Sequence, residues 1–160
     1  MIPQWFTPKA SRSEGVALHV KVKKLSPDAI VPKIAHQGDA GFDLYANEEA
    51  LLKPMERKLV GTGISIAFPK GFEAQVRPKS GLALNHGLIL PNSPGTIDAS
   101  YRGEIKVIIQ NLGEKDYKIE KGKKIAQVVF NKIEEPELIE VDELDETSRG
   151  KGGFGSTGLE

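Results

Sequence analysis

The sequence predicts an all-β protein built as a β-sandwich, a jelly roll or a barrel. Its 160 residues include 17 glycines and 10 prolines, enough to divide the chain into many short segments joined by turns. Runs of apolar and β-branched residues recur at a spacing of roughly ten residues, and almost no stretch has the period of a long helix. A chain of this length fits one domain that can bury a core.

The composition excludes several classes of protein. Lys and Arg number 22, as do Asp and Glu, so the formal net charge is zero, which argues against a dedicated nucleic-acid binder. The absence of cysteine excludes disulfides, thiolate metal ligands and a cysteine nucleophile. No run approaches the roughly 18 apolar residues of a membrane span, and the N-terminus lacks the apolar core of a signal peptide. We therefore expect a soluble cytoplasmic protein that binds neither nucleic acid nor membrane.

The first third of the chain predicts a flexible leader followed by one half-buried strand. Residues 1–15 show no periodicity and contain two prolines. Residues 16–25 alternate apolar and polar side chains, which is the pattern of a strand with one buried face. Residues 26–36 contain Pro27 and Pro32, so they are predicted to form an irregular connection.

The middle of the chain predicts three further strands and one short helix. Residues 56–68 form two short strand-like pieces around Gly61 and Gly63, and residues 72–76 form another after a Pro-Lys-Gly turn. Residues 82–86 have room for one or two helical turns.

The second half of the chain predicts a hairpin and two more strands. Residues 104–109 are rich in β-branched residues and predict a buried strand, whereas residues 94–103 are predicted to bend rather than to form a strand. Residues 117–119 predict a brief strand, and residues 124–133 a strongly apolar one.

The last part of the chain differs in composition from the rest. Residues 134–146 are crowded with acids, although alternation around Ile139 and Val141 allows one more strand. We therefore divide the chain into a leader (1–15), a β domain (16–148) and a Gly-rich C-terminal arm (149–160). The arm has one large apolar side chain, and ordering ten backbone units costs on the order of 10–20 kcal/mol, so we expect it to be mobile until a ligand binds.

Three stretches carry groups that suit chemistry on a nucleotide, and each also has a plainer interpretation. The predicted hairpin presents the carboxylate of Asp98 and the ring of Tyr101, but an ordinary solvated turn would look similar. The turn after residue 76 offers Arg77, Lys79, Ser80 and the start of a helix to an anion, unless it is only a surface turn. The arm combines glycine amides and Arg149 for phosphates with an aromatic ring for a base, and its alternative is a flexible terminus without a function.

No metal cage is predicted from the three histidines, which are far apart in the sequence. A metal would therefore be Mg²⁺ held mainly by phosphates and water, with Asp43 as the best nearby carboxylate. Because no Ser/His/Asp constellation is evident either, the simplest chemistry is a carboxylate that activates water, with Asp98 as the base.

Five motifs give these stretches a common interpretation. They are A-G-F-D-L-Y-A from Ala40, P-K-S-G-L-A from Pro78, G-T-I-D-A-S-Y-R-G-E from Gly95, G-K-K-I-A-Q from Gly122 and R-G-K-G-G-F-G-S-T-G from Arg149. In this order and spacing the chain resembles the trimeric deoxyuridine triphosphatases (dUTPases). The resemblance covers about residues 39–158. It implies a jelly-roll-like fold and a homotrimer with shared active sites. It also implies Mg²⁺-assisted hydrolysis of dUTP to dUMP and pyrophosphate, which keeps uracil out of DNA and supplies dUMP for thymidylate synthesis.

The resemblance also implies a role for individual residues. Asp98 would activate the water that attacks the α-phosphorus, Tyr101 would pack under the deoxyribose, and Asp43 would hold a water on Mg²⁺. The remaining implied contacts to the substrate are Lys79, Ser80, Gly81, Asn92, Gly95, Thr96, Ile97, Lys106 and Gln127 in the body, and Arg149, Phe154, Gly155, Ser156 and Thr157 in the arm. Among these, Asn92 would contact uracil, Phe154 would cover it, and Arg149 would reach the γ-phosphate.

Two positions depart from the family pattern. Lys79 stands where arginine is frequent, which keeps the charge but loses the bidentate fork. Ser100 stands where a second acid is frequent. Two alternatives to hydrolysis of dUTP stay open, namely a deaminase of the related dCTP group and a nucleotide-binding trimer without turnover.

Overall fold

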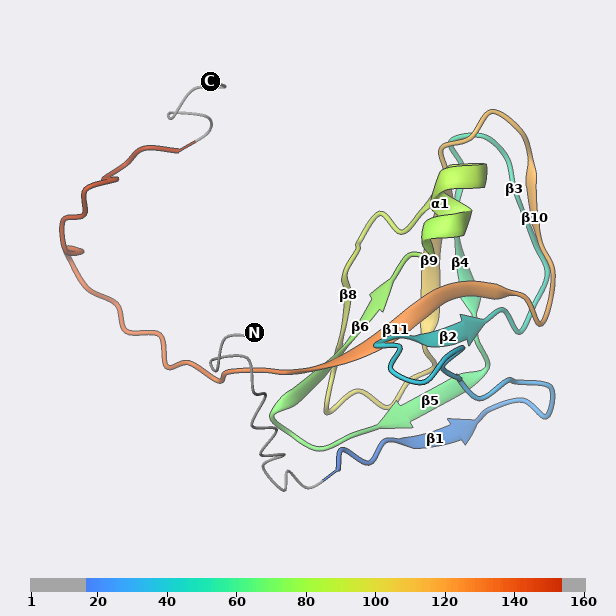
Figure 1. Cartoon of the computed structure of the whole chain (residues 1–160), viewed down its shortest axis with the longest axis horizontal. Coiled ribbons are helices and arrows are strands. Elements are labelled where there is room, and N and C mark those ends of the chain that lie inside the picture. The colour runs from blue at the N-terminus through green and yellow to red at the C-terminus, as the bar shows by residue number, and fades with distance from the viewer. Residues whose placement is uncertain (1–16, 154–160) are drawn as a thin grey trace, which may run out of the picture.

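The computed structural model describes residues 17–153, which form short strands, one helix and a long C-terminal segment (Figure 1). The strands of the first half are β1 (Lys21–Lys24), β2 (Phe42–Tyr45), β3 (Ala50–Leu52), β4 (Arg57–Gly61), β5 (Ile64–Ala67) and β6 (Phe72–Arg77). They are followed by α1 (Ser80–His86), β7 (Leu88–Ile89), β8 (Gly95–Asp98), β9 (Lys106–Asn111), β10 (Tyr117–Ile119) and β11 (Lys124–Lys132). No helix in this part of the chain is long and apolar enough to cross a membrane.

The strands pair antiparallel in small sheets, so the all-β prediction is confirmed. The largest sheet has the order β2-β11-β6-β8, a second has the order β4-β9-β7, and β1-β5 and β10-β3 form two-stranded sheets. The core between them is aliphatic, and its fully buried side chains include Leu44, Leu52, Ile64, Ile105, Ile109 and Ile119. Because the side chains of a strand alternate between its two faces, most strands contribute one set of side chains to this core, whereas β5 is buried on both faces.

The four-stranded sheet has one apolar and one polar face. Leu44, Ala74, Val76 and Val128 are buried against the core. The register places Gln127 of β11 opposite both Asp43 of β2 and Arg77 of β6. The outer face of this sheet therefore presents polar groups drawn from segments far apart in the sequence.

Most predicted strands are confirmed with shifted ends. The predictions for residues 72–76, 117–119 and 124–133 match β6, β10 and β11 closely, and α1 confirms the short helix. The strand predicted over residues 16–25 is shorter, since only Lys21–Lys24 pairs with β5. Its alternation is nevertheless real, because Val20 and Val22 pack partly buried against the core.

The prediction of a hairpin over Pro94–Asn111 is wrong. Residues 95–98 of its first half form a strand, β8, in which Gly95 and Ile97 are buried while Thr96 and Asp98 are exposed, whereas residues 99–103 bend as predicted. β8 pairs with β6, whereas β9 pairs with β4 and β7, so the two halves belong to different sheets. The glycine and the aspartate suggest a bend locally, but β6 offers an edge that draws the segment into a sheet.

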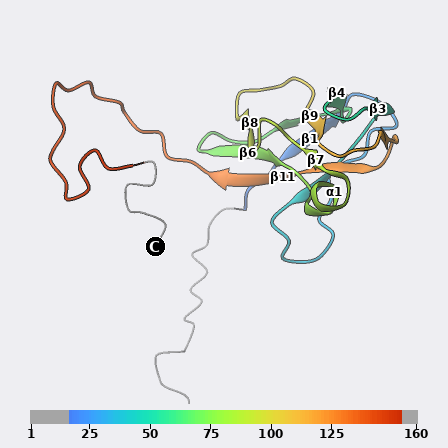
Figure 2. The same cartoon turned by 90° about the horizontal axis from the view of Figure 1, so that it is seen from above.

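The strand predicted around Ile139 and Val141 is also absent. No strand follows β11 up to residue 153, and this segment leads away from the body in both views (Figures 1 and 2). Its apolar side chains have no core to join, since Leu138 is 92% and Leu144 84% exposed. Alternation alone does not make a strand where no partner lies alongside.

Asn111 is the polar residue on which the end of β9 depends. It is fully buried; its Nδ2 donates to the Leu52 and Lys115 carbonyl oxygens at 3.0 and 2.8 Å, and its Oδ1 accepts from the Gly113 amide at 2.9 Å. Asn111→Ala removes all three bonds and leaves buried groups unpaired, so we expect the free energy of unfolding to fall by about 2–4 kcal/mol. Urea denaturation measures this change. Asn85, an exposed residue of α1, serves as the control. Asn85→Ala should change the free energy of unfolding by less than about 0.5 kcal/mol. Equal effects of the two substitutions would contradict the role of Asn111.

Candidate functional site

The first candidate cleft lies on the polar face of the four-stranded sheet. It has a volume of about 380 Å³ and is bounded by β2, β11 and the end of β6. Its charged and amide-bearing lining residues are Asp39, Asp43, Arg77, Lys79, Lys124 and Gln127. The cations outnumber the acids, so the cleft suits an anion.

Asp43 is the electrostatic centre of this cleft. Only 6% exposed, it accepts from Lys79 Nζ on Oδ1 at 2.5 Å and from Lys124 Nζ on Oδ2 at 2.7 Å. Burial raises the pKa of Asp43, but the hydrogen bonds and charges of Lys124 and Lys79 outweigh it and hold the pKa below its ordinary value. The hydrogen bond to Asp43 in turn raises the pKa of Lys124. Sequence reasoning found Asp43, Arg77 and Lys79 but missed Lys124.

The lowered pKa of Asp43 predicts how stability depends on pH. A carboxyl whose pKa is lower in the folded state adds stability above its unfolded pKa, and this stability is lost as pH falls through the folded pKa. Asp43→Asn should therefore be less stable than the parent near neutral pH, and the difference should shrink below about pH 4. Thermal unfolding from pH 7 to pH 3 measures it. In the exposed turn before β10, Asp116→Asn should show no such convergence, and a pH-independent difference for Asp43→Asn would contradict the role of the ion pairs.

Gly41 and Gln127 fit together at the floor of the same cleft. The Gln127 Nε2 donates to the Pro78 carbonyl oxygen at 2.9 Å, which anchors the turn that leads into α1. A Cβ at position 41 would collide with the Gln127 side-chain oxygen. Ser80 and Gly81 open α1 just beyond this turn and are exposed. The turn is therefore anchored by Gln127, while Ser80 and Gly81 stay exposed as candidate phosphate-binding residues.

The second candidate cleft lies where β8 ends and β9 begins. Its volume is about 320 Å³, and it is lined by Leu59, Asn92, Thr96, Ile97, Asp98, Tyr101, Glu104, Ile105, Lys106 and Ile108. Six of these are predicted site residues, so the structure brings them together although the hairpin prediction is wrong. Asp98 is exposed at the last position of β8.

Tyr101 is held over this cleft by its own loop. Its hydroxyl donates to the Glu104 carbonyl oxygen at 3.0 Å, and its amide donates to the Asp98 carbonyl oxygen at 3.0 Å. A Cβ at Gly103 would collide with the Tyr101 ring, so a larger residue there would displace the ring. The ring is therefore fixed by hydrogen bonds and close contact, although 47% of the residue stays exposed.

The two clefts are separate on one chain. They share no lining residue, and Asp98 lines one while Lys79 lines the other. Arg149 lines neither cleft, and its Nε donates to the Gly152 carbonyl oxygen at 2.9 Å within the arm. Phe154, Gly155, Ser156 and Thr157 lie outside the described residues, and so does the whole predicted leader, residues 1–15.

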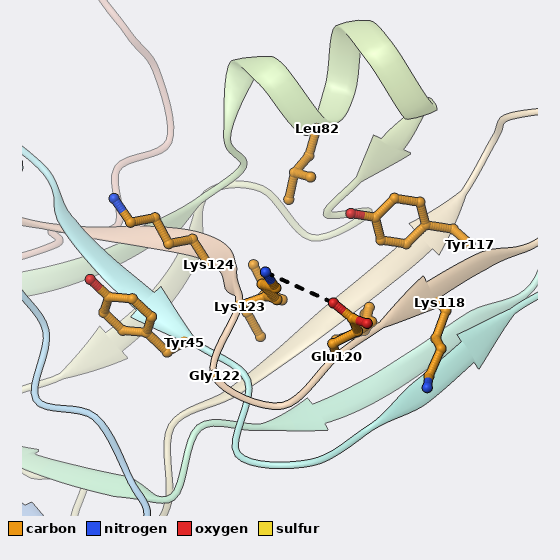
Figure 3. Close-up of a pocket in the computed structure, with 10 residues that line it drawn as sticks. Tyr45, Leu82, Tyr117, Lys118, Glu120, Gly122, Lys123 and Lys124 are labelled. Atoms are coloured by element: carbon orange, nitrogen blue, oxygen red, sulfur yellow. Dashed lines mark ion pairs between the residues drawn. The ribbon is translucent and has the colours of Figure 1, made fainter.

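A third pocket lies beneath α1, next to the β10–β11 turn (Figure 3). It is lined by Leu82, two tyrosines and the turn, and none of the predicted site residues contributes to it. Its three lysines all pair with acids: Lys118 with Glu49 at 3.2 Å, Lys123 with Glu120 at 3.9 Å and Lys124 with Asp43 at 2.7 Å. The pocket therefore has little free positive charge for a phosphate.

The described part of the chain contains no ready-made metal cage. Within residues 17–153 there is no group of three or more His, Cys, Asp or Glu side chains placed to hold an ion. Asp43 is the only buried acid of the first cleft, and both of its oxygens face ammonium groups. This donor set fits a Mg²⁺ ion only if phosphates and water supply most of its ligands.

A comparison with protein-family models decides the relationship. The dUTPase model matches residues 27–158, which is most of the chain and contains both clefts. The chain belongs to the dUTPase family. The resemblance seen in the five motifs and the predicted fold class are thereby confirmed.

This dUTPase has close relatives in sequence and in structure. It is 58% identical over 141 residues to the deoxyuridine 5'-triphosphate nucleotidohydrolase of Clostridium kluyveri, an alignment that covers 88% of this chain and 99% of the relative. Among solved structures it is similar to the Staphylococcus bacteriophage 80alpha dUTPase with dUpNHpp, with a TM-score of 0.82, 30% identity and coverage of 88% and 99% of the two chains.

A second phage structure bears on the metal. A dUTPase variant from phage phi11 of S. aureus is similar with a TM-score of 0.74 and 27% identity, covering 80% of this chain and 99% of that one. That structure is described as revealing how a structural Mg(II) ion is coordinated.

Proposed function

We propose that this dUTPase hydrolyses dUTP to dUMP and pyrophosphate, with Asp98 as the general base. The cleft shared by Asn92, Asp98 and Tyr101 carries this proposal, because it combines an amide for a base, a ring for a sugar and a carboxylate for water. Asp98 removes a proton from water, whose oxygen attacks the α-phosphorus. The bond from the α-phosphorus to the bridging oxygen breaks, and pyrophosphate leaves with that electron pair.

The first cleft, which contains Asp43 and Lys79, binds the triphosphate in this proposal. The Gln127 side chain anchors the turn, and Lys79, Ser80 and Gly81 lie at the entrance of α1, where their donors are available to phosphate oxygens. A phosphate that approaches Lys79 and Lys124 competes with Asp43 for their ammonium groups. Mg²⁺, when bound with the nucleotide, would neutralise charge on the phosphates, with Asp43 holding one of its waters.

The separation of the clefts supports an assembly in which copies share active sites. A nucleotide that spans both clefts must take its nucleoside contacts from one copy and its phosphate contacts from another, and a homotrimer provides three such pairs. The segment that follows β11, residues 133–148, supports the same arrangement. It leads away from its own body and exposes Leu138, Ile139 and Val141 to 92%, 75% and 56%, so a neighbouring copy is the natural surface to cover them.

One assay tests the proposed reaction against its two alternatives. The protein is supplied with dUTP or dCTP in the presence of Mg²⁺, and pyrophosphate and ammonia are measured. Pyrophosphate from dUTP without ammonia is the expected result. Ammonia from dCTP would replace the proposal with a deaminase, and binding without either product would indicate a trimer that has no turnover. Light scattering on the same sample measures the number of copies.

A further inference from the structure

Three polar side chains of β6 form a chain of hydrogen bonds on the outer face of the largest sheet. The Gln75 Oε1 accepts from Arg77 Nε and Nη2 at 3.1 and 2.6 Å, and its Nε2 donates to Glu73 Oε1 at 2.6 Å. All three residues are partly buried. Because Arg77 occupies the amide oxygen of Gln75, the amide nitrogen is left to donate to Glu73, so the Glu73 carboxylate is held in one place.

Glu73 lies directly opposite Asp98 in the sheet. The antiparallel register pairs Glu73 of β6 with Asp98 of β8, and both residues line one pocket. Side chains at directly opposite positions lie on the same face, with Cβ atoms roughly 4.5–5.5 Å apart. Neither carboxylate forms an ion pair among residues 17–153. The two negative charges are therefore neighbours without a cation between them in the described chain.

A second feature points to the same spot. Asn131 of β11 lies opposite Glu73 on its other side, so Asn131, Glu73 and Asp98 form a row across three strands. The Asn131 Nδ2 is buried and has no hydrogen-bond partner in the described part of the chain. Glu73 therefore has three polar neighbours: the Gln75 amide that donates to it, the Asn131 amide and the like charge of Asp98.

We propose that Glu73 is a positioning residue that directs Asp98 toward the second cleft, in which the proposed function places the nucleoside. Like charges at opposite positions of a sheet repel each other. Glu73 is fixed by Gln75, whereas Asp98 stands at the free end of β8, so repulsion turns the Asp98 carboxylate away from β6 and toward the cleft that contains Tyr101. This inference rests on the proposed function, in which Asp98 activates water.

The test is a double-mutant cycle of Glu73→Gln and Asp98→Asn, measured on the full chain with dUTP and Mg²⁺. Gln at position 73 keeps the shape and an oxygen that accepts from Gln75, so it removes the charge and little else. In the parent background we expect kcat to fall about tenfold or more while KM changes by less than about threefold, because misplacing a reacting group lowers turnover more than binding. In the Asp98→Asn background, assayed in long single-turnover incubations, Glu73→Gln should have no further effect.

The control substitution removes a different carboxylate from the same pocket. Glu134 lines the same pocket but is exposed beyond β11, and Glu134→Gln should leave kcat unchanged. Unchanged kcat in Glu73→Gln would overturn the inference, and so would an equal fall in both backgrounds, since that would indicate a merely structural role. A parent protein that releases no pyrophosphate from dUTP would instead overturn the proposed function itself.

Discussion

Asp98→Asn is expected to lower the turnover of dUTP by a factor on the order of 10²–10⁴, the usual contribution of a positioned general base. The amide has the shape of the carboxylate but cannot take a proton from water. Asp98 is exposed at the end of β8 and forms no ion pair among the described residues, so its loss should not destabilise the fold. Nucleotide binding should therefore persist while hydrolysis fails.

Two measurements separate these effects. Steady-state release of pyrophosphate gives kcat, and calorimetric titration with dUpNHpp, the ligand of the phage 80alpha structure, gives binding in the absence of turnover. The matched control is Ser100→Ala, which changes an exposed side chain two residues further along the same loop and should keep normal turnover. Near-normal turnover in Asp98→Asn would remove Asp98 as the base, and a joint loss of binding and turnover would show that the cleft itself had collapsed.

The strands that could be predicted are those whose local pattern agrees with their surroundings. β11 has a long apolar run that agrees with its place inside the largest sheet, and the glycine turn at Gly122 marks its start. β8 could not be predicted because its residues favour a bend, and only the edge of β6 makes them a strand. Residues 139–144 are the opposite case, in which a strand-like pattern meets no partner within residues 17–153.

The individual residues of the candidate site could be proposed from the sequence, but their arrangement in space could not. The five motifs identify Asp43, Lys79, Asp98 and Tyr101, yet nothing local reveals that Lys124 pairs with Asp43. That pair arises because β2 and β11 lie side by side with a register shift next to Lys124. The same pairing of distant strands places Glu73 opposite Asp98. Electrostatic neighbours of this kind depend on register, which a sequence pattern does not specify without the topology.

Removing residues 149–160 is expected to lower kcat/KM for dUTP by on the order of 10²-fold or more and to leave the body folded. Within the described part of the arm, the hydrogen bonds of residues 149–153 are local. Arg149 Nε donates to the Gly152 carbonyl oxygen at 2.9 Å, and the Gly150 amide donates to the Thr147 carbonyl oxygen at 3.0 Å. The loss of these contacts should therefore not change the urea midpoint.

The loss of activity follows from what the arm is proposed to bring to the nucleotide. Ordering a backbone unit costs roughly 1–2 kcal/mol, so an arm whose residues 149–153 form only local hydrogen bonds closes only when a ligand offsets that cost. Arg149 would supply a fixed positive fork to the terminal phosphate, and Phe154 a ring for the base. Without them the triphosphate stays open to water and less well oriented, and misplacement of this kind lowers the rate about 100-fold.

A shorter deletion provides the matched control. The family match ends at residue 158, so removing only Leu159 and Glu160 should retain full activity. Urea denaturation and light scattering on both truncated proteins establish that the body and its assembly are intact. If the longer deletion unfolds the protein, the arm belongs to the stable structure rather than closing over a ligand. If it is fully active, the arm takes no part in the reaction, and the phosphate contacts must all come from the cleft around Lys79 and Lys124.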